Sequence, residues 1–321
     1  MDGQKNIWDA SVATIGCGAI GSAAAELLAR AGVGRLKVVD RDLVELSNLH
    51  RQLLYDERHA VEGLPKVVAC AERLRQINSD VEVEPVVDDV NPRNMEAIIS
   101  DVDIIVDGTD NFETRFILND AALKLGKPWI YGAALETYGV VMPIVPDRSP
   151  CLRDLVPSPP PPGSLPTCEA VGVLNAVTVA VASLQVTESL KILTGRIDDA
   201  GKAVYIDLWN SRFEVMKIER REDCPACVLG KYEFLEGRFT RDLVLCGRNA
   251  VQISPRVEVE LNLEELAGRL EKTVSVRLRQ QVLYIKVDGY EIAVFRNGRA
   301  IVKGTSDPAL AKSLYSRYVG L

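Results

Sequence analysis

The chain has 321 residues, of which 47% are hydrophobic and 26% charged, and its net charge at pH 7 is −7. This length and composition predict a soluble protein of two domains with ample hydrophobic core. The acidic balance argues against a large nucleic-acid surface. No basic segment followed by an apolar one opens the sequence, so we do not expect a secreted protein.

Two further features bear on the compartment. Seven cysteines, an odd number that includes one Cys-x-x-Cys pair, fit a reducing cytoplasm better than a disulfide framework. The apolar stretch from Val171 to Val186 is interrupted by polar residues and is short for a membrane span, which favours a buried helix. We therefore expect a cytoplasmic protein with no membrane segment.

The first chemical signal is a glycine-rich turn. An apolar run, Val12 to Ile15, ends at Gly16, and an alanine-rich helix former follows, so the turn joins a strand to a helix. Gly16 permits the tight turn, Gly18 lets a ligand approach the backbone, and Gly21 lets helix and strand pack closely. Such a turn presents phosphate to a helix N-terminus.

The next strand, Leu36 to Val39, ends at Asp40, which is placed to accept hydrogen bonds from ribose hydroxyls. Taken alone, the glycine turn and Asp40 fit an NAD-dependent oxidoreductase, and a tight turn without any ligand is the plainer alternative. The residues that follow favour ATP instead.

Cleavage of a nucleoside triphosphate between its α and β phosphates requires positive groups around the developing charge. Arg51 and Lys66 supply two, and Lys66 follows Pro65 at the start of a helix that we expect to reach Ile77. Asp110 follows the strand Val102 to Val106, at the sheet edge where ligands bind, and could hold Mg²⁺. Each residue singly is more often a surface charge or a helix cap.

At this point the chain resembles a known family. GCGAIG, VVDRDLVELSNLHRQ, GLPKV and DGTDNFETR are similar to motifs of the ThiF/MoeB/HesA adenylyltransferases, relatives of the ubiquitin-activating enzymes, from about Ser11 to Leu321. The resemblance implies a Rossmann-like doubly wound α/β sheet and a homodimer. It also implies the use of ATP to adenylate the C-terminal Gly-Gly carboxylate of a ubiquitin-like sulfur carrier such as ThiS or MoaD.

By matching positions, the resemblance implies that Asp40 binds ribose, that Asn48, Arg51 and Lys66 bind the phosphates, and that Asp110 holds magnesium. Family members usually begin with a segment that supplies an arginine to the partner subunit's ATP site, whereas this sequence has no arginine before Arg30. Three alternatives stay open: a start further upstream, a substitute group, or a weakly active relative that still binds the carrier. A relative acting on a carboxylate of modified tRNA is disfavoured by the acidic balance.

The cysteines divide by setting. Cys17, Cys70 and Cys246 are interpreted as core residues, whereas Cys224-Pro225-Ala226-Cys227 has the spacing of half a tetrahedral zinc site. The matching half in the family is a second Cys-x-x-Cys, and here that place reads Cys151-Leu152-Arg153-Asp154. An aspartate can ligate zinc, so a Cys151, Asp154, Cys224, Cys227 site is one hypothesis, and a lost metal site is the other.

Cys168 follows a proline-rich segment and precedes the long apolar helix, which we expect over Ala170 to Leu193. A helix N-terminus stabilises a thiolate, the reactive form of cysteine. The resemblance implies that this cysteine joins covalently to the carrier protein, as a thioester or persulfide. The alternatives are a plain helix-start residue or the missing zinc ligand.

The remaining pattern predicts an adenylation domain over residues 1–230 and a small α+β domain over 231–321. Further strands are expected at Val81–Val87, Trp129–Gly132 and Val140–Val145, and a hairpin around Asn210-Ser211. In the tail, Asn262 begins a helix, Asp307-Pro308 begins another, and hairpin turns fall at Asp288-Gly289 and Asn297-Gly298. His59 is expected on a solvated helix. The sequence names neither the carrier nor the sulfur donor.

Overall fold

The computed structural model describes residues 2–160, 171–197, 200–237, 249–253, 255, 259–271, 273–279 and 281–320, and the backbone of 244–245. The chain divides into two compact units, Met1–Thr240 and Arg241–Leu321. The sequence pattern places the boundary at residue 230. The first unit extends further because the backbone amides of Phe234 and Leu235 donate to Asp120, a buried carboxylate of that unit.

The first unit is built on an eight-stranded sheet with the order β3-β2-β1-β4-β5-β6-β7-β8. The strands β3, β2, β1, β4 and β5 pair in parallel. The strands β6, β7 and β8 continue the sheet with antiparallel pairs. The predicted doubly wound sheet is confirmed. The strands are β1 (Ser11–Ile15), β2 (Arg35–Val39), β3 (Glu82–Val86), β4 (Ile104–Asp107), β5 (Trp129–Leu135), β6 (Tyr138–Ile144), β7 (Lys202–Asp207) and β8 (Arg212–Lys217).

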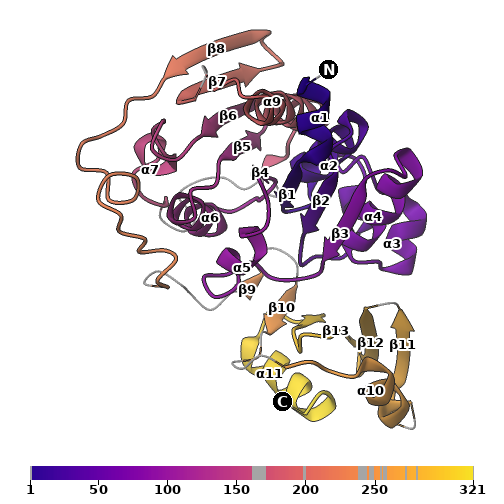
Figure 1. Ribbon diagram of the computed structural model, residues 1–321. Helices are drawn as coiled ribbons and strands as arrows, with labels where there is room; N and C mark the ends of the chain where they lie inside the picture. Colours follow the sequence, from indigo (N-terminus) through magenta and orange to yellow (C-terminus); the bar gives the residue numbers. More distant parts are fainter. Residues whose placement is uncertain are drawn as a thin grey trace. The chain divides into compact units, whose positions relative to one another are not determined.

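Helices cover both faces of this sheet (Figure 1). The alternation of strand side chains divides the core: Val12 of β1 packs in the cluster with α2, α4 and α9, while its neighbour Ala13 packs in the cluster with α5 and α6. The helices of this unit are α1 (Asp2–Asp9), α2 (Ala19–Ala31), the 3₁₀ turn η1 (Leu46–Asn48), α3 (Glu57–Glu62), α4 (Lys66–Ile77), α5 (Met95–Ile99), α6 (Phe112–Lys124), α7 (Leu152–Leu155) and α9 (Asn175–Leu193).

Helix α9 packs against α2, β5 and β6. It begins at Asn175, not at the expected Ala170, because the backbone just before it pairs with Glu136 through a bridge to Val173 and a hydrogen bond from Leu174. Among the described residues, α9 alone is long and apolar enough to pass a length-and-composition test for a membrane span, and 39% of its most apolar window is buried. Core helices pass the same test.

Helix α3 corrects one expectation. His59 is fully buried, not solvated: its Nδ1 accepts a hydrogen bond from the amide of Asp56, whose carboxylate in turn accepts from the amide of His59. Burial lowers the pKa of His59, although Asp56 opposes this shift. The helical periodicity of this short segment did not reveal the reciprocal cap.

The second unit holds a six-stranded antiparallel sheet with the order β11-β12-β13-β14-β10-β9. The predicted caps form, since the side chains of Asn262 and Asp307 accept hydrogen bonds from the amides of Glu265 and Ala309. The predicted turns also lie between paired strands. The elements are β9 (Val244–Leu245), β10 (Ala250–Ile253), α10 (Leu263–Leu270), β11 (Ser275–Arg279), β12 (Val282–Val287), β13 (Tyr290–Phe295), β14 (Ala300–Lys303) and α11 (Pro308–Tyr318).

Candidate functional site

The glycine turn between β1 and α2 has the geometry that its residues predict. A Cβ on Gly16 would lie 2.5 Å from the carbonyl oxygen of Gly108, and one on Gly21 would lie 1.9 Å from the carbonyl oxygen of Gly16. Gly18 differs, because a Cβ there would meet only Nε2 of Gln52, at 4.0 Å. Two glycines are therefore required by close packing, while Gly18 faces space at the helix N-terminus.

Asp40 ties the end of β2 to this turn. One carboxylate oxygen accepts from the amide of Cys17 at 2.6 Å, and the other accepts from the amide of Asp42 at 2.7 Å. Burial raises the pKa of Asp40, while the positive charge of Lys66 lowers it. Asp40 is thus a structural part of the turn as well as the residue expected to bind ribose.

Lys66 is buried at the first position of α4, with its side chain 4% exposed. Its ammonium lies 3.0 Å from Oδ2 of Asp42, and its backbone amide donates to the carbonyl of the same residue at 2.9 Å. Asp42 was missed by the sequence analysis. Its signal was its position two residues after Asp40, on the loop that leads to the polar stretch from Ser47 to Gln52.

The η1 region holds two buried amides with incomplete hydrogen bonding. Asn48 is 4% exposed and Gln52 is 3% exposed, and Oδ1 of Asn48 and Oε1 of Gln52 have no hydrogen-bond partner among the described residues. Arg51 is placed differently. Its guanidinium contacts the carbonyl of Ser47 at 3.3 Å and Nε2 of His50 at 3.4 Å. No described contact joins Arg51 to Lys66.

Asp110 is exposed, three residues after the end of β4, and accepts a hydrogen bond from Asn111, the cap of α6. Its charge acts on two arginines. Burial lowers the pKa of Arg41, but the charges of Asp89, Asp42 and Asp110 raise it by more, so the net shift is upward. Asp110 also adds to the raised pKa of Arg115. Arg41, which pairs with Asp89 at 2.8 Å, was not singled out from the sequence.

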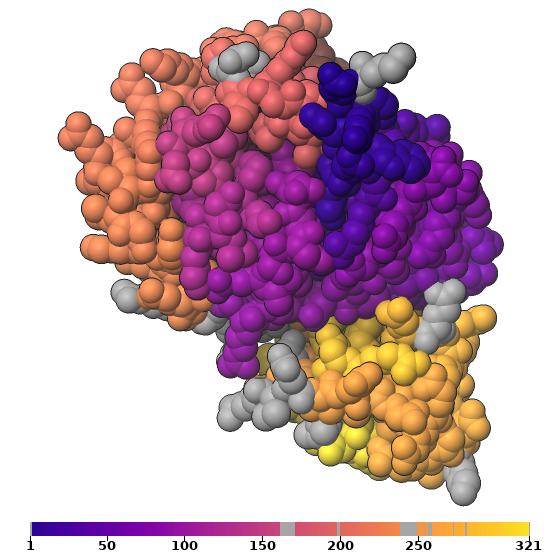
Figure 2. Space-filling view, viewed as in Figure 1, coloured from indigo at the N-terminus to yellow at the C-terminus, as the bar shows by residue number. Residues whose placement is uncertain are grey.

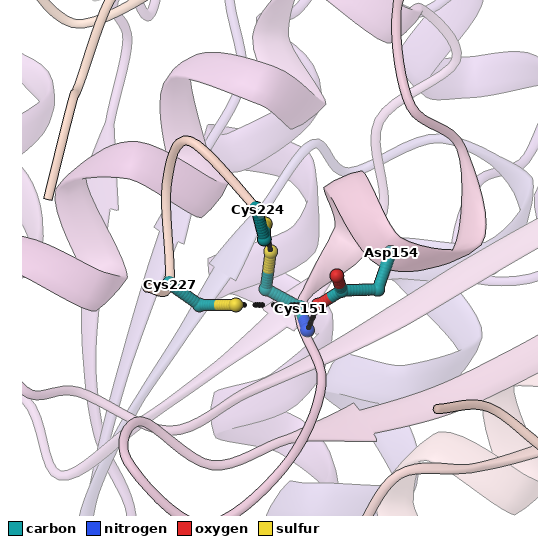
Figure 3. A group of neighbouring side chains, drawn as sticks. All are labelled: Cys151, Asp154, Cys224 and Cys227. Carbon is teal, nitrogen blue, oxygen red and sulfur yellow. Dashed lines mark hydrogen bonds between the residues drawn. The ribbon is translucent and has the colours of Figure 1, made fainter. Parts of the chain in front are cut away.

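The second candidate site joins distant segments. The side-chain atoms that could bind a metal ion, from Cys151, Asp154, Cys224 and Cys227, all lie within 4.8 Å of one another (Figure 3). The sulfurs of Cys151 and Cys224 are 3.6 Å apart, and Sγ of Cys227 donates to Oδ2 of Asp154 at 3.2 Å. Hydrogen bonds from Cys151 and Cys227 lower the pKa of Cys224, and the bond to Cys224 raises that of Cys151.

The other cysteines have separate settings. Cys17 and Cys70 are fully buried in the core, as expected, and the hydroxyl of Tyr55 donates to Sγ of Cys17 at 3.0 Å. The predictions for Cys168 and Cys246 lie outside the described residues.

Comparison with known proteins decides the family. The profile of the ThiF family matches residues 1–226. The chain belongs to the ThiF family. It is 44% identical to the sulfur carrier protein ThiS adenylyltransferase of Bacillus subtilis, over 99% of this chain and 95% of the relative. It is 38% identical to a sulfur carrier protein adenylyltransferase of Thermus thermophilus, over 70% of this chain and 85% of the relative.

Solved structures agree on the fold of this ThiF-family chain. The crystal structure of E. coli MccB with ATP superposes with a TM-score of 0.62 at 21% identity, over 70% of this chain and 69% of that one. SeMet PaaA superposes with a TM-score of 0.57 at 21% identity, over 68% and 76%. Family membership favours the adenylation hypothesis over the dehydrogenase alternative that the glycine turn alone allowed.

Proposed function

We propose that this protein adenylates the C-terminal glycine carboxylate of a ubiquitin-like sulfur carrier protein, using ATP. The observation that carries the proposal is the chain of contacts from the ammonium of Lys66 through Asp42 and Asp40 to the glycine turn. It couples a buried cation to the phosphate-binding turn. The relative of 44% identity, which is named for this activity on ThiS, supports the same conclusion.

The described residues fit a bound nucleotide. Gly18 leaves the N-terminus of α2 accessible, and the first amides and dipole of that helix attract phosphate. The buried oxygens of Asn48 and Gln52, which have no partner among the described residues, are acceptors that a donor on a ligand or a water would satisfy. Arg51 would exchange its contact with Ser47 for a phosphate oxygen.

The chemistry follows from these groups. A carboxylate oxygen of the carrier attacks the α phosphorus, an oxygen–phosphorus bond forms, and the bond to the β-phosphate oxygen breaks, so that pyrophosphate leaves with the electron pair. No general base is required, because the nucleophile is already ionised. Lys66 and Arg51 offset the charge that develops on the phosphate oxygens. Mg²⁺ would supply further charge neutralisation, and the exposed carboxylate of Asp110, at the carboxyl end of β4, is a ligand of the type it prefers.

ATP–pyrophosphate exchange with a small protein ending in Gly-Gly tests this proposal. Exchange that depends on the carrier is expected from the unmodified protein. Carrier-independent ATP turnover, or none with any sulfur carrier of this class, would contradict it. The chemistry of the site does not name the individual carrier.

Cys151, Asp154, Cys224 and Cys227 fit a structural zinc ion. A tetrahedral ion with Zn–S bonds of about 2.3 Å brings its sulfurs to roughly 3.8 Å from one another, and the sulfurs of Cys151 and Cys224 are 3.6 Å apart. Asp154 would be the fourth ligand, and its side chain is fully buried. This ligand set of three thiolates and one carboxylate would bind zinc less tightly than four thiolates.

A homodimer is proposed through the surface of α9 and β8. Helix α9 is 39% buried over its most apolar window, and the hairpin of β7 and β8 exposes three large apolar side chains: Trp209 at 74%, Phe213 at 60% and Val215 at 59%. Large apolar side chains that are exposed together on one hairpin are typical of an interaction site. The N-terminal helix α1 lies against α9 at the molecular surface (Figures 1 and 2).

Two elements of the proposal rest on family membership. The thiolate of Cys168 would attack the carbonyl of the carrier's acyl adenylate and form a thioester while AMP leaves, or it would take part in persulfide transfer from a sulfur donor. Replacement by alanine should spare exchange while removing any covalent adduct. An adduct that survives this replacement would contradict the role. The protein is proposed to act in the cytoplasm, which the free cysteines of the core fit.

A further inference from the structure

A buried ion pair lies beneath the loop that carries Asp110. Arg115, one turn into α6, places its Nε 3.0 Å from Oδ2 of Asp107, the last residue of β4. The arginine side chain is 7% exposed and the aspartate is fully buried. Burial lowers the pKa of Arg115, but the charge of Asp107 and its hydrogen bond, together with Tyr131 and Asp110, raise it by more, so the net shift is upward.

This pair fixes the backbone on both sides of the loop. Nη2 of Arg115 donates to the carbonyl of Thr109 at 2.7 Å and to the carbonyl of Gly132 in β5 at 3.0 Å. Asp107 completes the arrangement, since its Oδ1 accepts from the amide of Thr109 at 2.9 Å and from its hydroxyl at 2.7 Å. The residue immediately before Asp110 is therefore held through its carbonyl, amide and side chain.

Aromatic rings hold the guanidinium in place. Its central carbon lies 5.5 Å from the centre of the Phe112 ring and 5.4 Å from that of Tyr131. The planar guanidinium of arginine can donate to three acceptors while it stacks on aromatic rings, and the ammonium of lysine cannot. A buried ion pair is a costly way to stabilise a core, since apolar residues of similar volume serve as well or better. The pair therefore requires a reason beyond stability.

We propose that Arg115 is a positioning residue that sets the carboxylate of Asp110 for a divalent cation bound to ATP. The inference rests on the proposed function, because it takes Asp110 as the cation ligand. Arg115 acts through the backbone of Thr109. It also neutralises the charge of Asp107. Without Arg115, the carboxylate of Asp107 would add a second negative charge, besides that of Asp110, near the loop. Its own side chain touches neither ATP nor the cation.

The test compares Arg115→Lys with Asn119→Ala. Lysine keeps the charge opposite Asp107 but cannot reach three acceptors at once. Asn119 is also buried on α6, and its Oδ1 accepts from the amide of Leu152. Its replacement by alanine therefore perturbs the same helix at a point that does not contact the loop of Asp110. Affinity for α,β-methylene ATP is measured calorimetrically, once with Mg²⁺ and once with a chelator, together with the melting temperature of each variant.

For Arg115→Lys we expect an affinity loss of about tenfold in Mg²⁺ and less than twofold in chelator. Asn119→Ala should lower the melting temperature without changing the ratio of the two affinities. If Arg115→Lys keeps the unmodified ratio while Asp110→Asn loses it, the positioning role is wrong and the magnesium site stands. If Asp110→Asn also keeps the ratio, the magnesium site of the proposed function is wrong, and this inference falls with it.

Discussion

The ammonium of Lys66 and the carboxylate of Asp42 form an ion pair of 3.0 Å at the start of α4, and the backbone amide of Lys66 donates to Asp42 as well. This double contact explains how a lysine with 4% exposure is held in one position with an opposite charge beside its ammonium. Because Asp42 also donates its amide to Asp40, the same residue connects the lysine to the glycine turn.

The first prediction concerns Asp42. Asp42→Asn keeps the size of the side chain but removes the charge opposite the buried ammonium, so the pair loses its compensation. We expect a 10- to 100-fold fall in ATP–pyrophosphate exchange, with a loss of stability of about 2 kcal/mol. Urea unfolding followed by circular dichroism separates the two effects. Unchanged exchange in a folded Asp42→Asn would show that Asp42 does not position Lys66.

The glycine turn offers a matched pair of substitutions. Gly18→Ala adds a methyl group that meets only Nε2 of Gln52, so the protein should keep its melting temperature within about 2 °C and lose ATP affinity by at least tenfold. Gly21→Ala drives a methyl group to 1.9 Å from a carbonyl oxygen and should destabilise the fold. Thermal unfolding with and without ATP distinguishes them. Full ATP affinity in Gly18→Ala would place the phosphates elsewhere.

These two glycines show what the sequence could predict. The turn, the strands around it and the caps follow from local patterns, because a strand, a glycine and a helix start are each encoded within a few residues, whereas the doubly wound sheet was expected from the family resemblance. Asp42 and Arg115 could not be found this way. Their importance lies in contacts with residues 24 and eight positions away in sequence, which periodicity does not encode. The prediction that His59 is exposed to solvent was wrong, because a reciprocal cap with Asp56 holds this polar residue in the interior.

The cysteine cluster also joins residues that are distant in sequence, but here the sequence named all four of them. The spacing of Cys224 and Cys227 predicted half a site, and the family resemblance supplied Cys151 and Asp154, which the structure brings within 4.8 Å of them. Sequence spacing could not show that Asp154 also accepts from the amides of Cys151 and Arg221. These bonds orient the carboxylate toward the sulfurs.

The cluster leads to a prediction about metal content. The purified protein should contain about one zinc per chain, and Asp154→Cys should keep zinc against a chelator that strips the unmodified protein, because four thiolates bind zinc more tightly. Asp154→Ala should lose the metal and lower the melting temperature by several degrees. Elemental analysis of the three proteins checks this. A zinc-free native protein with the same melting temperature as Asp154→Ala would contradict it.

Asp120 gives a prediction on pH. Burial raises the pKa of its carboxyl to about 6, although the amides of Phe234 and Leu235 oppose this. Because the folded pKa lies above the unfolded value, the folded state holds the proton more tightly, so stability is highest below about pH 4 for this group and falls as the pH rises through 6. The loss is roughly 2–3 kcal/mol.

Asp120→Asn should remove that dependence, because asparagine keeps an acceptor for both amides and does not titrate. Urea unfolding of both proteins between pH 4.5 and 7.5 measures the difference in slope. Parallel curves for the two proteins would show that Asp120 is already ionised in the folded state throughout this range.

The most direct test of the account is ATP–pyrophosphate exchange with a Gly-Gly-ended carrier, measured for the unmodified protein, Lys66→Ala and Asp110→Ala. We predict carrier-dependent exchange in the unmodified protein and a fall of at least 100-fold in each variant, with folding retained. Exchange that persists at the unmodified rate in both variants would contradict the proposed site.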